Sequence, residues 1–117
     1  MKRGDVVLMD YPFSNGTGRK VRPVLVVLAD RYLQKLAHTV VVPITSSPSR
    51  FVGDASQLVI EDNSPEARQS GLRLRSVIQC ESLLAIRKTF VIRTLGSLPL
   101  TTMQQIDECL KSALDLS

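Results

Sequence analysis

The stretch RKVRPVLVVL, residues 19–28, joins a cluster of positive charge to a run of apolar residues. The cations are Arg19, Lys20 and Arg22, and after a proline the apolar run continues over Val24–Ala29. A continuous run of this length, rich in β-branched residues, is typical of a central strand buried on both faces. The sequence therefore predicts a core strand beginning at Val24, with three cations at its mouth.

Strand-like runs also dominate the rest of the chain. Asp30–Leu36 is expected to form a helical turn or two, with Asp30 as the N-cap. Further strands are predicted at Val6–Tyr11, Thr39–Thr45, Gln57–Ile60, Leu74–Cys80 and Thr89–Leu95.

The last segment has a different spacing. Thr101–Gln104 has the Ser/Thr-x-x-Gln form of a capping box, and apolar residues at helical spacing follow it. Short strands with one amphipathic terminal helix predict a mainly β fold. We expect a small, strongly bent sheet or barrel of about five to seven strands, closed by the helix.

Length and composition set limits on the class of protein. The 117 residues suffice for one domain, residues 1–117, with a single core. The apolar stretches are too short to span a bilayer, so we expect no membrane. MKRGDVV shows no secretory signal, so we expect a cytoplasmic protein. The formal net charge of +4 is compatible with nucleic-acid binding and equally with ordinary solubility. A small sheet protects its edges by closing or by pairing with a second subunit, so a homodimer is expected.

Several familiar catalytic sites are absent from the sequence. There is no phosphate-binding GxxxxGK[ST], no GxGxxG after a strand and no HExxH. His38 is the only histidine, and neither cysteine lies in a metal-ligand spacing. We therefore expect no metal and no cofactor, and any enzyme would work without them.

Arg22 and Thr45 are the strongest candidates for a site. Arg22 begins one predicted strand and Thr45 ends another, so an antiparallel pairing would bring both to the same end of the sheet. A guanidinium and a hydroxyl together suit an oxyanion or phosphate. The alternative is a surface arginine beside an ordinary turn, and the residues alone leave both open.

The order and spacing of three motifs resemble the MazF/PemK toxins of toxin–antitoxin modules. The motifs are KRGDVV at the start, the K-x-R-P-V stretch around Arg22, and Pro43–Ser46. The similarity then continues through Ser76–Glu81 and the strand before Gly96 to the final helix.

The resemblance implies a fold and a reaction. It implies an SH3-like, MazF/CcdB-like barrel and a homodimeric endoribonuclease that cuts single-stranded RNA, usually at a short sequence, without metal. The 2′-hydroxyl would attack the adjacent phosphate, giving a 2′,3′-cyclic phosphate and a 5′-hydroxyl. A cognate antitoxin is expected to neutralise the enzyme by docking across the dimer.

The same resemblance implies the site residues. Arg22 would be the catalytic arginine, and Thr45 would bind the scissile phosphate. Further RNA-binding residues are expected at Arg19, Lys20, Ser46, Ser47, Asp5, Gln79 and Glu81. For Arg19 and Lys20 a solvated loop, and for Asp5 a structural partner of a backbone amide or arginine, are the alternatives.

The sequence departs from several family members where they carry Arg-Cys-Asp. Here Gln79 replaces a cation, and Glu81 keeps the acid with one more methylene. Rate or sequence preference is therefore expected to differ. Two other readings stay open: a non-enzymatic CcdB-like toxin that inhibits DNA gyrase, and a catalytically weakened relative.

Overall fold

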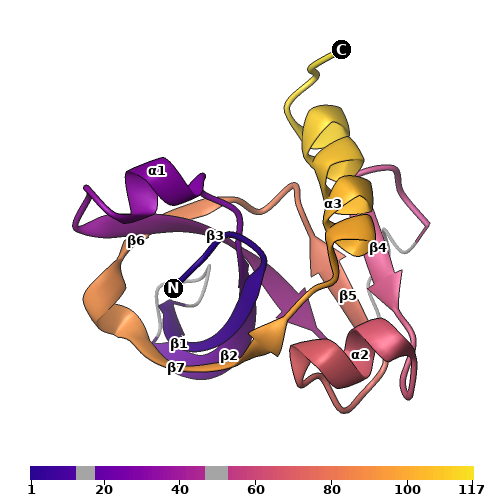
Figure 1. Cartoon of the computed structure of the whole chain (residues 1–117), viewed down its shortest axis with the longest axis horizontal. Helices are drawn as coiled ribbons and strands as arrows, with labels where there is room; N and C mark the ends of the chain where they lie inside the picture. Colours follow the sequence, from indigo (N-terminus) through magenta and orange to yellow (C-terminus); the bar gives the residue numbers. More distant parts are fainter. Residues whose placement is uncertain (13–17, 47–52) are drawn as a thin grey trace.

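The computed structural model describes residues 1–12, 18–46 and 53–117. They contain a seven-stranded antiparallel sheet with the order β4-β5-β3-β2-β1-β7, and β6 pairs with β3 beside this path (Figure 1). The strands are β1 (Asp5–Pro12), β2 (Arg19–Val26), β3 (His38–Thr45), β4 (Gln57–Ile60), β5 (Ser76–Gln79), β6 (Leu84–Arg87) and β7 (Val91–Ser97).

Three α-helices and a 3-10 turn complete the described fold. They are α1 (Asp30–Leu33), α2 (Pro65–Ser70), η1 (Lys88–Phe90) and α3 (Leu100–Ala113). Helix α3 stands beside β4 and β5, and α2 lies near the β7 end of the sheet (Figure 1). None of the described helices has the length and apolar character needed to span a membrane.

The central strands bury both of their faces, as the apolar run in β2 predicts. Val24 and Val26 pack in one core cluster with Val7 and Val41. Leu25 faces the other way, into a second cluster that receives α2 and α3. Because neighbouring residues of a strand point to opposite faces, β2 separates the two clusters.

The prediction of a mainly β fold with a C-terminal helix is confirmed, but the sheet is not closed into a barrel. In the described part of the chain, β6 pairs only with β3 and β7 only with β1. The turn η1 lies between β6 and β7, so the two strands leave it toward different partners. The sheet is curled and remains open at this point (Figure 1).

Strand β2 begins five residues before the predicted start at Val24. Tyr11 pairs with Lys20 and Met9 pairs with Arg22, so the ladder with β1 carries the strand through the cations. The prediction that the cations precede the strand was wrong, because pairing with a neighbour outweighs the local cost of charge in a strand.

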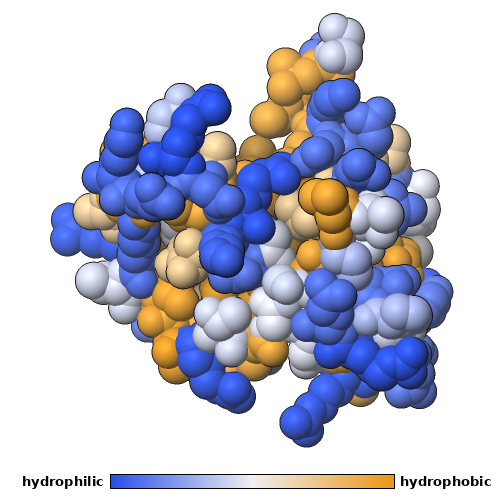
Figure 2. Space-filling view, viewed as in Figure 1, coloured by the Kyte–Doolittle hydropathy of each residue, from blue (hydrophilic) through white to orange (hydrophobic). Residues whose placement is uncertain are grey.

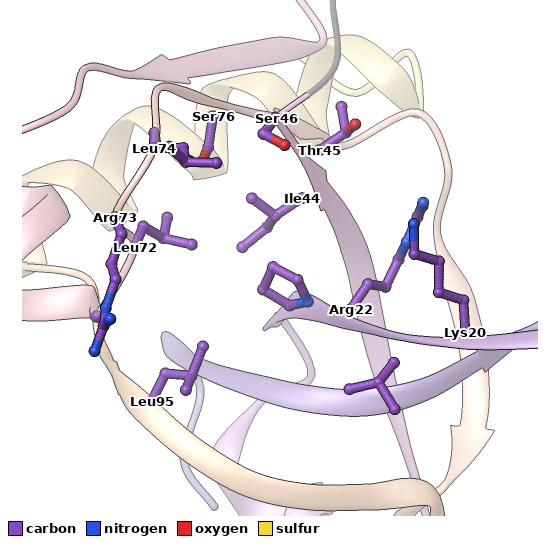
Figure 3. Close-up of a pocket in the computed structure, with 13 residues that line it drawn as sticks. Lys20, Arg22, Ile44, Thr45, Ser46, Leu72, Arg73, Leu74, Ser76 and Leu95 are labelled. Atoms are coloured by element: carbon purple, nitrogen blue, oxygen red, sulfur yellow. The ribbon is translucent and has the colours of Figure 1, made fainter.

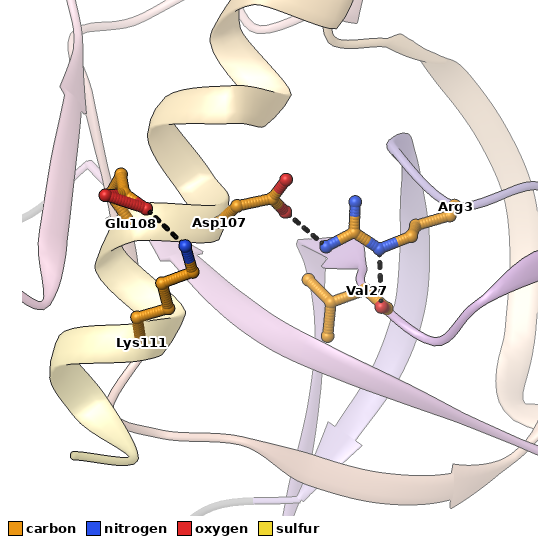
Figure 4. A network of polar contacts seen from close by, with 5 residues as sticks. All are labelled: Arg3, Val27, Asp107, Glu108 and Lys111. Carbon is orange, nitrogen blue, oxygen red and sulfur yellow. Dashed lines mark hydrogen bonds and ion pairs between the residues drawn. The ribbon is translucent and has the colours of Figure 1, made fainter. Parts of the chain in front are cut away.

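The first residues of the chain fasten α3 to the sheet. Arg3 donates from Nε to the Val27 carbonyl at 2.9 Å and from Nη2 to Asp107 of α3 at 2.7 Å (Figure 4). Gly4, with a φ of 95°, donates to the Val26 carbonyl and accepts from Leu98. This N-terminal clasp, Arg3 and Gly4, links both ends of the chain to β2.

Candidate functional site

The register of the sheet brings Arg22 and Thr45 together. Strands β2 and β3 are antiparallel neighbours, and Val24 pairs with Pro43. Two residues back along β2 and two forward along β3, the same register sets Arg22 opposite Thr45. The sequence-level argument therefore reached the right juxtaposition, although Arg22 lies within its strand and not at its start.

Both residues line a pocket of about 340 Å³. In Figure 3 Lys20 and Arg22 rise from β2 on one side, and Thr45 and Ser46 lie at the end of β3. Arg73 lies on the opposite side of the pocket. The apolar part of the lining consists of Val21, Pro23, Ile44, Leu72, Leu74 and Leu95.

Tyr11 positions the Arg22 side chain. The guanidinium carbon lies 5.3 Å from the centre of the Tyr11 ring, which is within the range of a cation–π contact. Burial raises the pKa of the Tyr11 phenol, and the positive charge of Arg22 opposes that shift. The ring therefore stays neutral at ordinary pH and supports the half-buried guanidinium from β1.

The arrangement suits an anion that carries a flat apolar group. Arg22 and Lys20 supply positive charge, and the hydroxyls of Thr45, Ser46 and Ser76 supply hydrogen-bond donors. The apolar lining between them offers a surface on which a base can pack.

The other predicted site residues divide into those at the pocket and those away from it. Lys20 and Ser46 line it. Arg19 is the first residue of β2, but its side chain lies outside the description, and Ser47 lies outside the described residues. Asp5, at the far end of β1, accepts a hydrogen bond from the Lys2 amide at 2.9 Å, which is the structural alternative considered for it.

Gln79 and Glu81 lie beside β4 and are absent from the pocket lining. Gln79 pairs with Gln57 in the β4–β5 ladder. The Glu81 carboxylate accepts from Gln57 Nε2 at 2.9 Å and from the Ser56 hydroxyl at 3.3 Å. In this structure Glu81 therefore joins β4 to the end of β5.

Comparison with known proteins identifies the family. The model of the PemK-like, MazF-like toxins of type II toxin–antitoxin systems matches residues 2–114. This chain belongs to that family. A search of curated protein sequences found no match.

Solved structures share the toxin fold over the whole chain. An endoribonuclease from a mycobacterial species, in complex with its cognate antitoxin, is similar with a TM-score of 0.77 and 20% identity, covering 100% of this chain and 97% of that one. The Mycobacterium tuberculosis toxin MazF-mt6 gives 0.73 and 22%, covering 95% and 98%. The MazE–MazF complex of Deinococcus radiodurans gives 0.73 and 17%, covering 100% and 98%.

The toxin pocket also contains residues that sequence reasoning did not assign to it. Gly71 to Leu74 and Ser76 enter it from the connection between α2 and β5, and Leu95 enters from β7. Arg73 was considered only as a substitute for the cation missing at Gln79, whereas Arg75 instead pairs with Glu61 at 3.0 Å. No local pattern marks these residues, because α2 and the path after it bring them to the end of β3.

Proposed function

We propose that this toxin is a sequence-specific endoribonuclease that cleaves single-stranded RNA without a metal ion, with Arg22 and Thr45 as its catalytic residues. The observation that carries the proposal is the juxtaposition of Arg22 and Thr45 at one pocket with an apolar lining. Family membership supports it, and so do structural neighbours described as endoribonucleases.

The proposed step is an internal transesterification. The 2′-hydroxyl oxygen forms a bond to the adjacent phosphorus, and the bond from phosphorus to the 5′ oxygen breaks. The proton lost by the 2′ oxygen is matched by the proton gained by the 5′ oxygen, which leaves a 2′,3′-cyclic phosphate and a 5′-hydroxyl. Arg22 stabilises the charge that builds on the phosphoryl oxygens and assists the proton transfer, and Thr45 holds the scissile phosphate.

The same pocket would select the RNA around the cut. Lys20 and Ser46 line it beside the proposed catalytic residues, and we propose that they contact the neighbouring phosphates, with Arg19 and Ser47 continuing this surface. The apolar lining favours a single strand, because a base must leave its stack to pack there. For Asp5, Gln79 and Glu81 an RNA contact stays a prediction, since none of them lines the pocket.

We further propose that the toxin acts as a homodimer and that a cognate antitoxin inhibits it. Two of the structural neighbours are toxins bound to antitoxins. The formal net charge of +4 favours an antitoxin segment of acidic composition that covers the cationic pocket.

The test is cleavage of a long single-stranded RNA of mixed sequence by the purified protein in EDTA. We expect discrete fragments with 5′-hydroxyl ends. Arg22→Ala should lower the cleavage rate by about 10²- to 10³-fold, as expected for losing one preorganised charge donor. Thr45→Val, which removes the hydroxyl while keeping the shape of the side chain, should also slow cleavage.

Arg87→Ala is the matched control, because Arg87 is an exposed cation on β6 outside the pocket. Its cleavage rate should equal that of the unmodified protein. Fragments that persist unchanged with Arg22→Ala would refute the proposed site. Intact RNA at every protein concentration, with inhibition of gyrase supercoiling, would instead assign the CcdB-like function.

A further inference from the structure

A second cleft continues the toxin pocket toward α2 and β7. Its volume is about 720 Å³, and it shares Gly71, Leu72, Arg73 and Leu95 with the first pocket. Two more arginines reach it, Arg68 from α2 and Arg93 from β7. We call Arg68, Arg73 and Arg93 the arginine shelf.

The charges of the shelf are not neutralised within the described part of the chain. Other cations there have carboxylate partners: Arg3 pairs with Asp107, and Arg75 pairs with Glu61. Arg68, Arg73 and Arg93 are exposed and have no carboxylate oxygen within 4.0 Å among the described residues. Hydrophilic residues cover this side of the molecule, over α2 (Figure 2).

Close packing of glycines holds the two sides of the shelf together. A Cβ on Gly71, the left-handed C-cap of α2, would lie 2.7 Å from the Leu95 carbonyl. A Cβ on Gly96 would lie 2.2 Å from the Gln69 carbonyl. Both glycines therefore let the end of α2 touch β7, which fixes Arg68 and Arg73 relative to Arg93.

The lining between the arginines is partly apolar. Leu8 pairs with Arg93 across the β1–β7 ladder, and it lines the cleft with Leu72 and Leu95. Guanidinium groups bind phosphate through two parallel hydrogen bonds and also stack on bases. Three arginines around an apolar floor therefore match a flexible chain that alternates phosphates with bases.

We propose that the arginine shelf binds single-stranded RNA as it leaves the catalytic pocket, so that substrate recognition extends beyond the cut nucleotides on one side. The inference rests on the proposed function, because the shared lining makes the two clefts one continuous surface. The shelf adds affinity for long substrates and takes no part in the chemical step.

The test compares a shelf variant with a control of equal charge. The shelf variant is Arg68→Gln/Arg93→Gln, and Arg73 is kept because it also lines the catalytic pocket. The control is Lys35→Gln/Arg87→Gln, two exposed cations outside both clefts. Once a long RNA has shown the cut site, each protein is assayed on a short RNA spanning the cut and on RNAs extended on its 5′ or 3′ side.

We expect the shelf variant to raise KM about tenfold for one of the extended RNAs, the combined effect of two exposed charge contacts. Its kcat, and its kcat/KM for the short RNA, should stay unchanged. The salt dependence of binding, measured by fluorescence anisotropy with RNA that is 2′-deoxy at the cut nucleotide, should lose about 1.4 from its log–log slope, about 0.7 per phosphate. The control variant should behave as the unmodified protein.

An equal loss on short and extended RNAs, or no loss on either, would overturn the inference. A change in sedimentation mass with unchanged RNA binding would assign the shelf to a protein interface and also overturn it. If the unmodified protein cuts no RNA, the proposed function fails separately. Anisotropy with the same long RNA then decides the shelf, since only the shelf variant should bind it more weakly.

Discussion

At the scale of single residues, burial controls the chemistry of the two thiols. Cys80 follows β5 and Cys109 lies in α3, and both are buried and free. Burial raises the pKa of Cys80 from 9.0 to about 12, and the hydrogen bond that it shares with Cys109 adds to the shift. Burial also raises the pKa of Cys109. Both side chains are therefore protonated at neutral pH and serve the core as small apolar groups.

The raised pKa of Cys80 makes the stability of the fold depend on pH. Its contribution is present below the unfolded value of 9.0 and is lost as pH rises toward about 12, because only the unfolded chain then releases the proton. The free energy of unfolding should fall by about 1.4 kcal/mol per pH unit in this window.

Urea unfolding from about pH 8 to about pH 10.5 measures this loss, and Cys80→Ala serves as the reference. The variant keeps every other titrating group, so the difference between the two pH profiles isolates Cys80. Parallel profiles for the two proteins would show that Cys80 titrates normally in the folded state.

At the scale of elements, the two longer helices begin in different ways. The capping box predicted at Thr101–Gln104 was wrong: the N-cap of α3 is Pro99, and no side chain caps it. Helix α2, which the sequence did not predict, has the side-chain cap. The Ser64 hydroxyl accepts a hydrogen bond from the Ala67 amide at 3.1 Å, and Pro65 follows as the first helical residue.

Helix α1 differs in the same respect. Ala29 and not Asp30 is its N-cap, and the Asp30 carboxylate accepts instead from the Arg3 amide at 2.6 Å. In α1 and α3 a polar residue of the right type stands within two residues of the actual N-cap. Tertiary contacts shifted the helix start, so the short pattern misplaced it.

Paired substitutions test this account of the helix caps. Ser64→Ala should lower the free energy of unfolding by about 1 kcal/mol, because it leaves a first-turn amide of α2 without its partner. Thr101→Ala should change it by less than about 0.5 kcal/mol, since Thr101 is an exposed residue that caps nothing. Chemical denaturation of both variants gives the comparison, and a larger loss for Thr101→Ala would contradict it.

At the scale of the whole molecule, the N-terminal clasp explains the KRGD motif structurally. Arg3 connects the end of β2 with α3, and the Gly4 side of the turn has the Met103 side chain 3.4 Å from where a Cβ would stand. The Asp5 carboxylate closes the turn on the Lys2 amide. The motif thus ties α3 to the sheet and lies outside the pocket lining.

Arg3→Met tests whether the clasp serves stability alone. The free energy of unfolding should fall by about 1–2 kcal/mol, because the variant leaves the Asp107 carboxylate and the Val27 carbonyl without a partner, while partial exposure of the ion pair limits the loss. RNA cleavage by the folded variant should keep its kcat/KM. A selective fall in kcat/KM, with unchanged unfolding, would instead assign Arg3 to substrate binding.

The sequence by itself determined the mainly β class, the buried central strand and the terminal helix. Each of these rests on side-chain periodicity or on a continuous apolar run, which local sequence carries directly. It also selected Arg22 and Thr45, because an antiparallel pairing of their strands was enough to bring them together.

Only the tertiary structure decided the start of β2, the presence of β6 and α2, and the open edge of the sheet. It also brought Arg73 and Leu95 to the pocket, and Arg68 beside Arg93 in the shelf. These features depend on which strands pair and on how closely α2 packs against β7 at Gly71 and Gly96. The physical reason is that such contacts join residues far apart in the chain, so no local pattern records them.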